Sequence, residues 1–122
     1  MKRMTIQRRA ILGTLESCKR PLSPEEILDE SRGEAESLNL ATVYRNLNAL
    51  LHDEQLVRVE VLGKPPRYEL AGLGHHHHFL CQECDRMFDL PGCPGLAKRS
   101  VPRGFKVTGH EIVMFGRCKT CA

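Results

Sequence analysis

Residues 75–84 read HHHHFLCQEC, four histidines followed by a Cys-x-x-Cys pair. A second pair, CKTC, occupies residues 118–121. Two such pairs supply the four thiolates of a closed structural zinc site. Thirty-three residues (85–117) separate the pairs, more than in a compact zinc ribbon, so this segment must fold to bring them together. The predicted zinc ligands are Cys81, Cys84, Cys118 and Cys121.

The histidines next to this site predict a second kind of metal chemistry. If residues 75–81 form a strand, successive side chains point to opposite faces, so His76 and His78 share one face and His75 and His77 share the other. This geometry allows two separate sites. A mixed nitrogen and oxygen ligand set suits iron(II), manganese, nickel or zinc, which leaves the metal open. The other candidate ligands nearby are Glu69, Asp89 and His110.

Other interpretations compete for these residues. The histidines could form a solvated loop or hydrogen-bonded core positions, although four in a row fit a core badly. The cysteines could form disulfides, as in small secreted domains. Cys93 is either a ligand, a redox thiol or neither, and Cys18 is expected to be a core residue at a helix end.

Composition narrows the class of protein. The chain has 122 residues and a formal net charge of +3, too small to identify nucleic acid as a partner. No apolar h-region follows Met1, and no apolar stretch approaches the ~18 residues of a membrane span. These features favour a cytoplasmic protein with metal-bound thiols over a secreted disulfide framework or a membrane protein.

The first seventy residues predict three helices followed by a hairpin. Helix starts are expected at Thr5, at Ser23 (which precedes Pro-Glu-Glu) and at Asn39. Alternating residues 57–61, a GKPP turn and residues 67–70 predict a two-stranded ribbon. This order is that of a winged helix-turn-helix, in which the third helix enters the major groove of DNA.

The third helix has a polar side and an apolar stripe, which consists of Leu40, Val43, Leu47, Leu50 and Leu51. Arg can read guanine, Asn can read adenine, and Thr or Tyr can touch thymine methyl groups. A plain helical core with a solvated polar face explains the same residues equally well. The polar positions are Thr42, Arg45, Asn46 and Asn48, and basic residues suited to phosphate are Lys2, Arg3, Arg8, Arg9, Arg58, Lys64 and Arg67.

The sequence divides near a short AGLG segment. We expect a DNA-binding domain at 1–70, a hinge at 71–74 and a metal-binding domain at 75–122, because five of six His and five of six Cys lie after residue 74. The second half predicts strands at 75–81, 86–90 and 105–115 and a helix at about 94–100. The expected fold class is α+β.

In these motifs the chain resembles the ferric uptake regulator superfamily of metal- and peroxide-responsive repressors. The matching elements span almost the whole chain and include ATVYRNL at 41–47, YEL at 68–70, the His-rich strand with its Cys pair, and G-x-C-x-x-C at 116–121. The resemblance implies a homodimer, with an N-terminal winged helix and a small C-terminal α/β dimerisation domain that holds structural zinc.

The resemblance also implies the roles of particular residues. A regulatory site at the hinge would use Glu69, His76, His78 and Asp89, with iron(II) or zinc, or else manganese or nickel. A second site would involve His75, His77 and His110, with Cys93 as a substitute ligand. The expected DNA-binding residues are Arg8, Thr42, Tyr44, Arg45, Asn46 and Lys64.

Several positions depart from the family pattern. Pro21 stands where iron and peroxide sensors usually supply a His, and Cys93-Pro94-Gly95-Leu96 replaces an expected acidic ligand. A thiolate at Cys93 would favour zinc at the second site. Gln55 replaces a common Gly, and the cysteine typical of zinc sensors near residues 70–71 is absent.

The predicted function is metal-dependent repression by a protein that is not an enzyme and binds a palindromic double-stranded operator. The first alternative is a peroxide sensor that uses iron-catalysed oxidation of a His. A different class would be a metal-storage module or a zinc-dependent hydrolase, although the sequence shows no established general-base motif.

Overall fold

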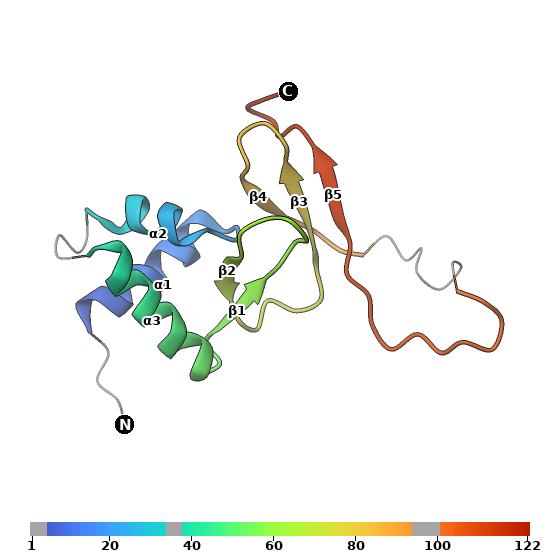
Figure 1. Cartoon of the computed structure of the whole chain (residues 1–122), viewed down its shortest axis with the longest axis horizontal. Coiled ribbons are helices and arrows are strands. Elements are labelled where there is room, and N and C mark those ends of the chain that lie inside the picture. The colour runs from blue at the N-terminus through green and yellow to red at the C-terminus, as the bar shows by residue number, and fades with distance from the viewer. Residues whose placement is uncertain (1–4, 34–37, 94–100) are drawn as a thin grey trace. The chain divides into compact units, whose positions relative to one another are not determined.

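The computed structural model describes residues 5–33, 38–93 and 101–122 (Figure 1). The chain forms two compact units, Met1–Leu73 and Gly74–Ala122, and each is described by itself. Within the described ranges, no helix is both long and apolar enough to cross a membrane. The first unit is helical with a small hairpin, and the second is built on a three-stranded sheet.

The helices of the first unit begin at the predicted caps. The side chains of Thr5, Ser23 and Asn39 each accept a hydrogen bond from the backbone N–H three residues later, which satisfies a donor left open in the first turn. Ser23 and Glu26 form a full capping box. The helices are α1 (Ile6–Cys18), α2 (Pro24–Ser31) and α3 (Leu40–His52).

One apolar core joins these helices. Val43, Leu47 and Leu50 of the predicted α3 stripe are fully buried. Leu40, expected on the same stripe, is 36% exposed, and Ile6 of α1 is 72% exposed. Both residues occupy the first helical position, where no preceding turn covers the side chain. A buried hydrogen bond of 2.8 Å between the hydroxyls of Thr14 and Ser31 links α1 to α2.

The hairpin follows α3, as predicted. Strand β1 (Leu56–Val59) pairs antiparallel with β2 (Arg67–Leu70), so the first strand starts and ends earlier than the expected residues 57–61. Leu22 adds a bridge to Tyr68, with reciprocal backbone hydrogen bonds of 2.9 and 2.8 Å. The segment between α1 and α2 therefore ties strand β2 to the helices.

The second unit contains β3 (His77–Cys81), β4 (Met87–Leu90) and β5 (Val113–Gly116) in the order β4-β3-β5. Strand β3 is central, pairing antiparallel with β4 and parallel with β5 (Figure 1). Because β3 and β5 are parallel neighbours, their carboxyl ends lie at the same edge of the sheet. This topology brings the two Cys-x-x-Cys segments together.

The predicted strand over residues 105–115 was wrong for most of its length. Residues 105–112 are not in a strand, and β5 begins only at Val113. Strand β3 has only five residues and pairs with β5 over residues 78–81. Residues 105–111 therefore lie beyond the start of β3. The predicted helix at 94–100 lies outside the described residues.

Candidate metal centres and nucleic-acid interface

The four predicted zinc ligands form one cluster. Cys81 ends β3 and Cys84 lies in the turn after it, while Cys118 and Cys121 follow β5. Their sulfur atoms all lie within 4.8 Å of one another, and Sγ of Cys84 is 3.8 Å from Sγ of Cys118. Four thiolates at about 2.3 Å from one zinc ion would be about 3.8 Å apart, so the cluster has the dimensions of a tetrahedral zinc site.

Backbone donors surround the central sulfur of this cluster. The N–H groups of Cys84 and Cys118 each lie 3.4 Å from Sγ of Cys81. These donors, with the Cys84 N–H first, lower the pKa of Cys81 to about 6. The Cys121 N–H similarly lowers the pKa of Cys118, whereas a hydrogen bond with Cys118 raises the pKa of Cys121 to about 12. Metal binding must therefore release the remaining thiol protons.

None of the six cysteines forms a disulfide in the structure. Cys18 is half-buried at the end of α1, and burial raises the pKa of its thiol. Cys93 is exposed on the loop after β4. Its position matters for the histidine cluster described below.

His76, His78 and Asp89 form the second group. Nε2 of His76 and Nε2 of His78 lie 3.5 and 3.4 Å from the same atom, Oδ1 of Asp89. The strand register explains this arrangement, because His78 pairs directly with Asp89 across β3 and β4.

The tautomer of His76 suits a metal ligand. Nδ1 of His76 lies 2.8 Å from the carbonyl oxygen of Gly74, which can only accept, so Nδ1 carries the proton. A neutral His76 then directs the lone pair of Nε2 at the Asp89 carboxylate. The Nε2 lone pair and the carboxylate are both hydrogen-bond acceptors. Their contact is stable only with a proton or a metal cation between them.

The fourth predicted ligand of this group, Glu69, lies in the other unit. It is on β2, opposite Val57, and only 4% exposed. A carboxylate this deeply buried needs a charged or hydrogen-bonding partner.

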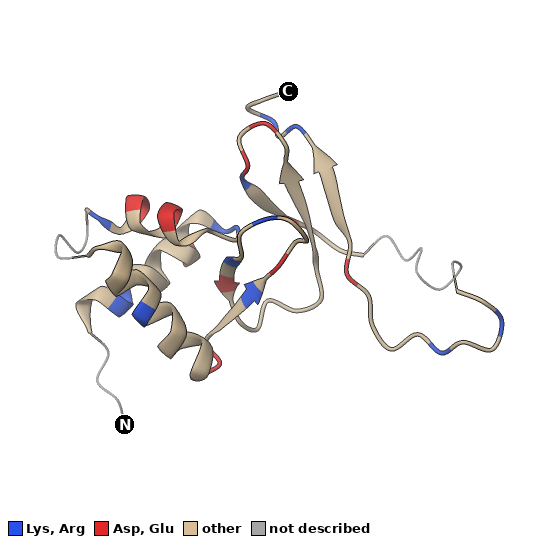
Figure 2. Ribbon diagram, in the orientation of Figure 1, with Lys and Arg blue, Asp and Glu red and all other residues tan. Residues whose placement is uncertain are grey.

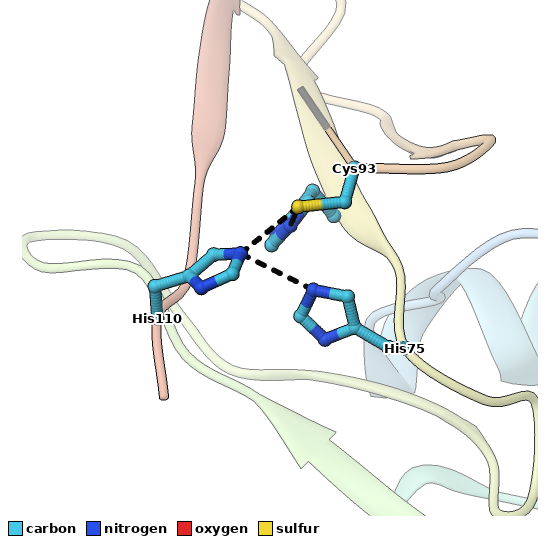
Figure 3. A group of neighbouring side chains, drawn as sticks. His75, Cys93 and His110 are labelled. Carbon is cyan, nitrogen blue, oxygen red and sulfur yellow. Dashed lines mark hydrogen bonds between the residues drawn. The ribbon is translucent and has the colours of Figure 1, made fainter. Parts of the chain in front are cut away.

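The third group contains His75, His77, Cys93 and His110, whose ligand atoms also lie within 4.8 Å of one another. Nε2 of His110 is 3.2 Å from Nε2 of His75 and 3.0 Å from Sγ of Cys93 (Figure 3). Nε2 of His77 is 3.3 Å from the same sulfur. The two faces of the His-rich segment thus carry separate clusters, as its alternation predicted.

His77 differs from the other histidines in its surroundings. It is 1% exposed, and its Nδ1 lies 3.1 Å from the backbone nitrogen of Ile112. Burial, and then the neighbouring imidazoles with His75 first, lower the pKa of His77. Both effects favour the neutral ring of His77 over the charged imidazolium.

The expected DNA-binding residues do not all face outward. Tyr44 is 42% exposed and Arg45 is also exposed on α3, while Asn46 is half-buried. Thr42 is only 6% exposed, and its hydroxyl accepts a hydrogen bond of 3.2 Å from Arg45. Thr42 thus supports the helix rather than presenting its side chain at the surface.

Charge in the first unit is unevenly distributed. Lys and Arg lie on α1, α3 and the β1–β2 hairpin, together with the acidic residues Glu16, Glu60 and Glu69, whereas every charged residue of α2 is acidic (Figure 2). Lys64 is exposed in the hairpin loop. Arg8 is less available for contact with DNA than Lys64, because its guanidinium is 3.9 Å from Asp53 and its side chain is 15% exposed.

Sequence reasoning missed two backbone groups. The carbonyl of Gly74 and the N–H of Ile112 each bond to Nδ1 of a histidine, and these bonds determine which ring nitrogen is protonated. No residue type marks a backbone group for this role, so the sequence contains no signal for either.

Known proteins resemble the chain over nearly its whole length. A sequence model of the ferric uptake regulator family matches residues 2–115. The ferric uptake regulation protein of Campylobacter jejuni is 32% identical over 123 residues, covering 96% of this chain and 78% of that protein. The peroxide operon regulator of Bacillus subtilis is 28% identical over 124 residues, covering 98% and 84%.

The fold agrees with these sequence matches. The structure of the Helicobacter pylori ferric uptake regulator, reported to have three functional metal binding sites, aligns with a TM-score of 0.74 and 28% identity. This alignment covers 99% of the present chain and 82% of the other. With the family match extending over residues 2–115, the protein belongs to the ferric uptake regulator family of metal-responsive transcription regulators.

Proposed function

We propose that the protein is a metal-dependent DNA-binding repressor whose regulatory metal is held by His76, His78 and Asp89. The observation that carries this proposal is the convergence of both histidine Nε2 atoms on Oδ1 of Asp89, at 3.5 and 3.4 Å. Imidazole and carboxylate ligands bind divalent metals reversibly near neutral pH, as a sensor requires.

Glu69 is the proposed fourth ligand. It belongs to the hairpin of the DNA-binding unit, and its burial is consistent with a carboxylate that has a charged partner. A metal bound by Glu69 and the histidines would couple metal occupancy to the position of the DNA-binding unit. By linkage, DNA must then tighten metal binding by the same factor by which metal tightens DNA binding.

The regulatory metal is proposed to be iron(II) or zinc. Manganese and nickel also suit a nitrogen and oxygen ligand set, so the donors alone do not choose among these ions. For the four-cysteine cluster we propose a permanent structural zinc, which is supported by the 3.8 Å sulfur separation.

DNA recognition is proposed to use the exposed face of α3 and the hairpin. Arg45 and Asn46 have the donors and acceptors to read base edges, Tyr44 can contact a thymine methyl group, and Lys64 can contact phosphate. We assign Arg8 and Thr42 supporting roles, since Arg8 is engaged by Asp53 and Thr42 is buried.

The proposed active form is a cytoplasmic homodimer. Residues 1–70 would form the DNA-binding domain, 71–74 the hinge, and 75–122 the dimerisation domain. A two-fold dimer reads two half-sites of a palindromic operator, and the separation of its recognition helices decides whether both can dock. The role is regulatory rather than catalytic.

A second candidate function is peroxide sensing, favoured by the 28% identity to the peroxide operon regulator of Bacillus subtilis. Iron at the regulatory site would then reduce peroxide and direct oxidation of a ligating histidine. This version predicts that peroxide abolishes DNA binding only in iron-loaded protein, with the mass of one oxygen atom added to His76 or His78.

Metal analysis of untagged protein, before and after dialysis against a mild chelator, tests the proposal when combined with DNA binding. We expect one zinc per chain to survive dialysis and a second metal to be removed and to restore DNA binding when returned. DNA binding that is indifferent to the removable metal would contradict the regulatory role. Metal binding without any salt-sensitive DNA binding would instead indicate a storage module.

A further inference from the structure

Thr42 lies in the first turn of α3 and makes three hydrogen bonds there. Its backbone N–H donates to the side chain of Asn39, the N-cap residue, at 2.9 Å. Its hydroxyl accepts a hydrogen bond of 3.2 Å from Nη2 of Arg45, and its backbone carbonyl accepts one of 2.9 Å from Nδ2 of Asn46. Thr42 is also only 6% exposed, so packing holds it in place. One fixed residue therefore holds two polar side chains of the next turn.

Helical spacing explains why both side chains reach Thr42. Residues three and four positions apart are neighbours on the surface of a helix, and Arg45 and Asn46 stand at those two positions after Thr42. Arg45 is exposed, so water could satisfy its guanidinium without the bond to Thr42. The bond therefore orients Arg45 and is not required to satisfy a buried donor.

The orientation of Arg45 leaves free donors for a base. A guanidinium has five N–H donors in a planar fork, and the hydroxyl of Thr42 uses one of them. Two adjacent donors match O6 and N7, the two acceptors that guanine presents in the major groove. A long side chain without such a restraint can turn to a backbone phosphate, which carries no sequence information. The restraint by Thr42 thus favours contact with a base.

Asn46 is held by a backbone group, which determines the direction of its amide. The carbonyl oxygen of Thr42 can only accept, so the atom that lies 2.9 Å from it must be the amide nitrogen. Nδ2 carries two hydrogens, and the second one lies next to Oδ1. A donor beside an acceptor matches N7 and the N6 amino group of adenine. The same pair does not match guanine, whose N7 and O6 both accept.

We propose that Thr42 is a positioning residue for a two-base reader, in which Arg45 contacts a guanine and Asn46 contacts an adenine of the same half-site. The inference rests on the DNA-binding role proposed for α3 and adds the bases that the helix reads. The side chain of Thr42 restrains Arg45, whereas its backbone restrains Asn46. A substitution at position 42 should therefore disturb the guanine contact and preserve the adenine contact.

Two substitutions at position 42 separate the hydroxyl from the shape of the side chain. Thr42→Val keeps the branched shape but has no acceptor for Arg45, whereas Thr42→Ser keeps the hydroxyl. Both variants retain the backbone carbonyl that holds Asn46. Arg45→Ala and Asn46→Leu remove the two reading groups and identify the base that each of them contacts.

The measurement uses the full-length protein with added zinc or iron(II) and a duplex that the wild-type protein selects from random-sequence DNA. Each guanine is replaced in turn by 7-deazaguanine and each adenine by 7-deazaadenine, which removes the N7 acceptor and preserves base pairing. Fluorescence anisotropy gives the ratio of the affinities for the unmodified and the modified duplex. This ratio is informative because a general loss of folding or of phosphate contacts lowers both affinities together.

For the wild-type protein we expect a guanine and an adenine in each half-site at which loss of N7 weakens binding roughly 2- to 13-fold, the net contribution of one hydrogen bond. The guanine effect should be absent in Arg45→Ala, and the adenine effect should be absent in Asn46→Leu. Thr42→Val should lose most of the guanine effect and keep the adenine effect. Thr42→Ser should keep both effects.

Several results would overturn the inference. An undiminished guanine effect in Thr42→Val would show that the hydroxyl does not position Arg45, and equal loss of both effects would indicate a general disturbance of α3. An adenine effect that survives in Asn46→Leu would assign that base to another residue, whether or not Thr42→Val folds. Absence of sequence-specific binding by the wild-type protein would overturn the proposed function as well, so the two failures are distinguishable.

Discussion

The backbone N–H of Ile112 lies 3.1 Å from Nδ1 of His77 and places the proton of that ring on Nε2. The adjacent His76 is protonated on Nδ1 instead, because it donates to the carbonyl of Gly74. Two neighbouring histidines of one segment therefore have opposite tautomers. The local backbone determines which of them is suited to bind metal directly.

The four-cysteine cluster should determine the stability of the second unit. Cys81→Ser removes the sulfur that accepts two backbone hydrogen bonds, and we expect loss of the retained zinc and of cooperative unfolding in this unit. Structural zinc contributes on the order of 10–16 kcal/mol in small zinc domains, far more than a unit of this size can replace by packing. Zinc content and thermal unfolding followed by circular dichroism measure the effect.

Cys18→Ser is the matched control for this substitution, since Cys18 lies at the end of α1 and belongs to none of the three clusters. It should retain one zinc per chain. If Cys81→Ser also kept its zinc and its unfolding transition, the assignment of a structural site would be wrong.

The capping box of α2 should contribute to the stability of the first unit. Ser23→Ala leaves the N–H of Glu26 without its side-chain acceptor and should lower the free energy of unfolding by about 1 kcal/mol. Urea denaturation measures this change. Ser17→Ala, at an exposed position within α1, should have an effect close to zero, and equal effects at the two positions would argue against the cap.

The hydroxyl pair between α1 and α2 should behave as a coupled unit. Thr14→Val keeps the shape of the side chain but leaves the fully buried hydroxyl of Ser31 without this partner, at a cost of about 1–3 kcal/mol. Ser31→Ala and the double variant complete a double-mutant cycle. We expect the double variant to lose clearly less free energy of unfolding than the sum of the losses in the two single variants. Strictly additive losses would show that the 2.8 Å hydrogen bond contributes no net stability.

Arg45 and Lys64 should differ in their effects on DNA binding. Arg45→Ala, on the exposed face of α3, should cost about 1–3 kcal/mol on a preferred sequence and relax specificity. Lys64→Ala, in the hairpin loop, should weaken binding to all sequences. It should also reduce the slope of the logarithm of the binding constant against the logarithm of the salt concentration by about one. Binding isotherms at several salt concentrations separate the two outcomes, and identical sequence-independent losses would contradict base recognition by Arg45.

The local signals of the sequence predicted the first unit well. Thr5, Ser23 and Asn39 cap the helices as expected, because capping depends on residues only three positions apart. The strand expected over residues 105–115 failed for a non-local reason. The length of β5 is limited by its partner β3, and hydrophobic alternation within one segment contains no information about that limit.

The grouping of the metal ligands was predictable from the sequence, but their protonation was not. Alternation along residues 75–78 assigned the histidines to two faces, and the structure brings Cys93 and His110 to the face of His75 and His77. The protonation pattern was not predictable, because it depends on the backbone groups of Gly74 and Ile112. Likewise, the burial of Thr42 follows from tertiary packing that its polar side chain does not indicate.

The most direct test of the account is the metal dependence of DNA binding in wild-type and His76→Ala/His78→Ala proteins, using a duplex selected from random-sequence DNA by the metal-loaded protein. Fluorescence anisotropy would be measured with iron(II), zinc and manganese in turn, with His52→Ala as the control for loss of a histidine outside the clusters. We predict that at least one metal tightens wild-type and His52→Ala binding roughly 5- to 150-fold, the usual range of allosteric coupling, and that the double variant shows no such response. Full metal dependence in the double variant would show that His76 and His78 do not hold the regulatory metal.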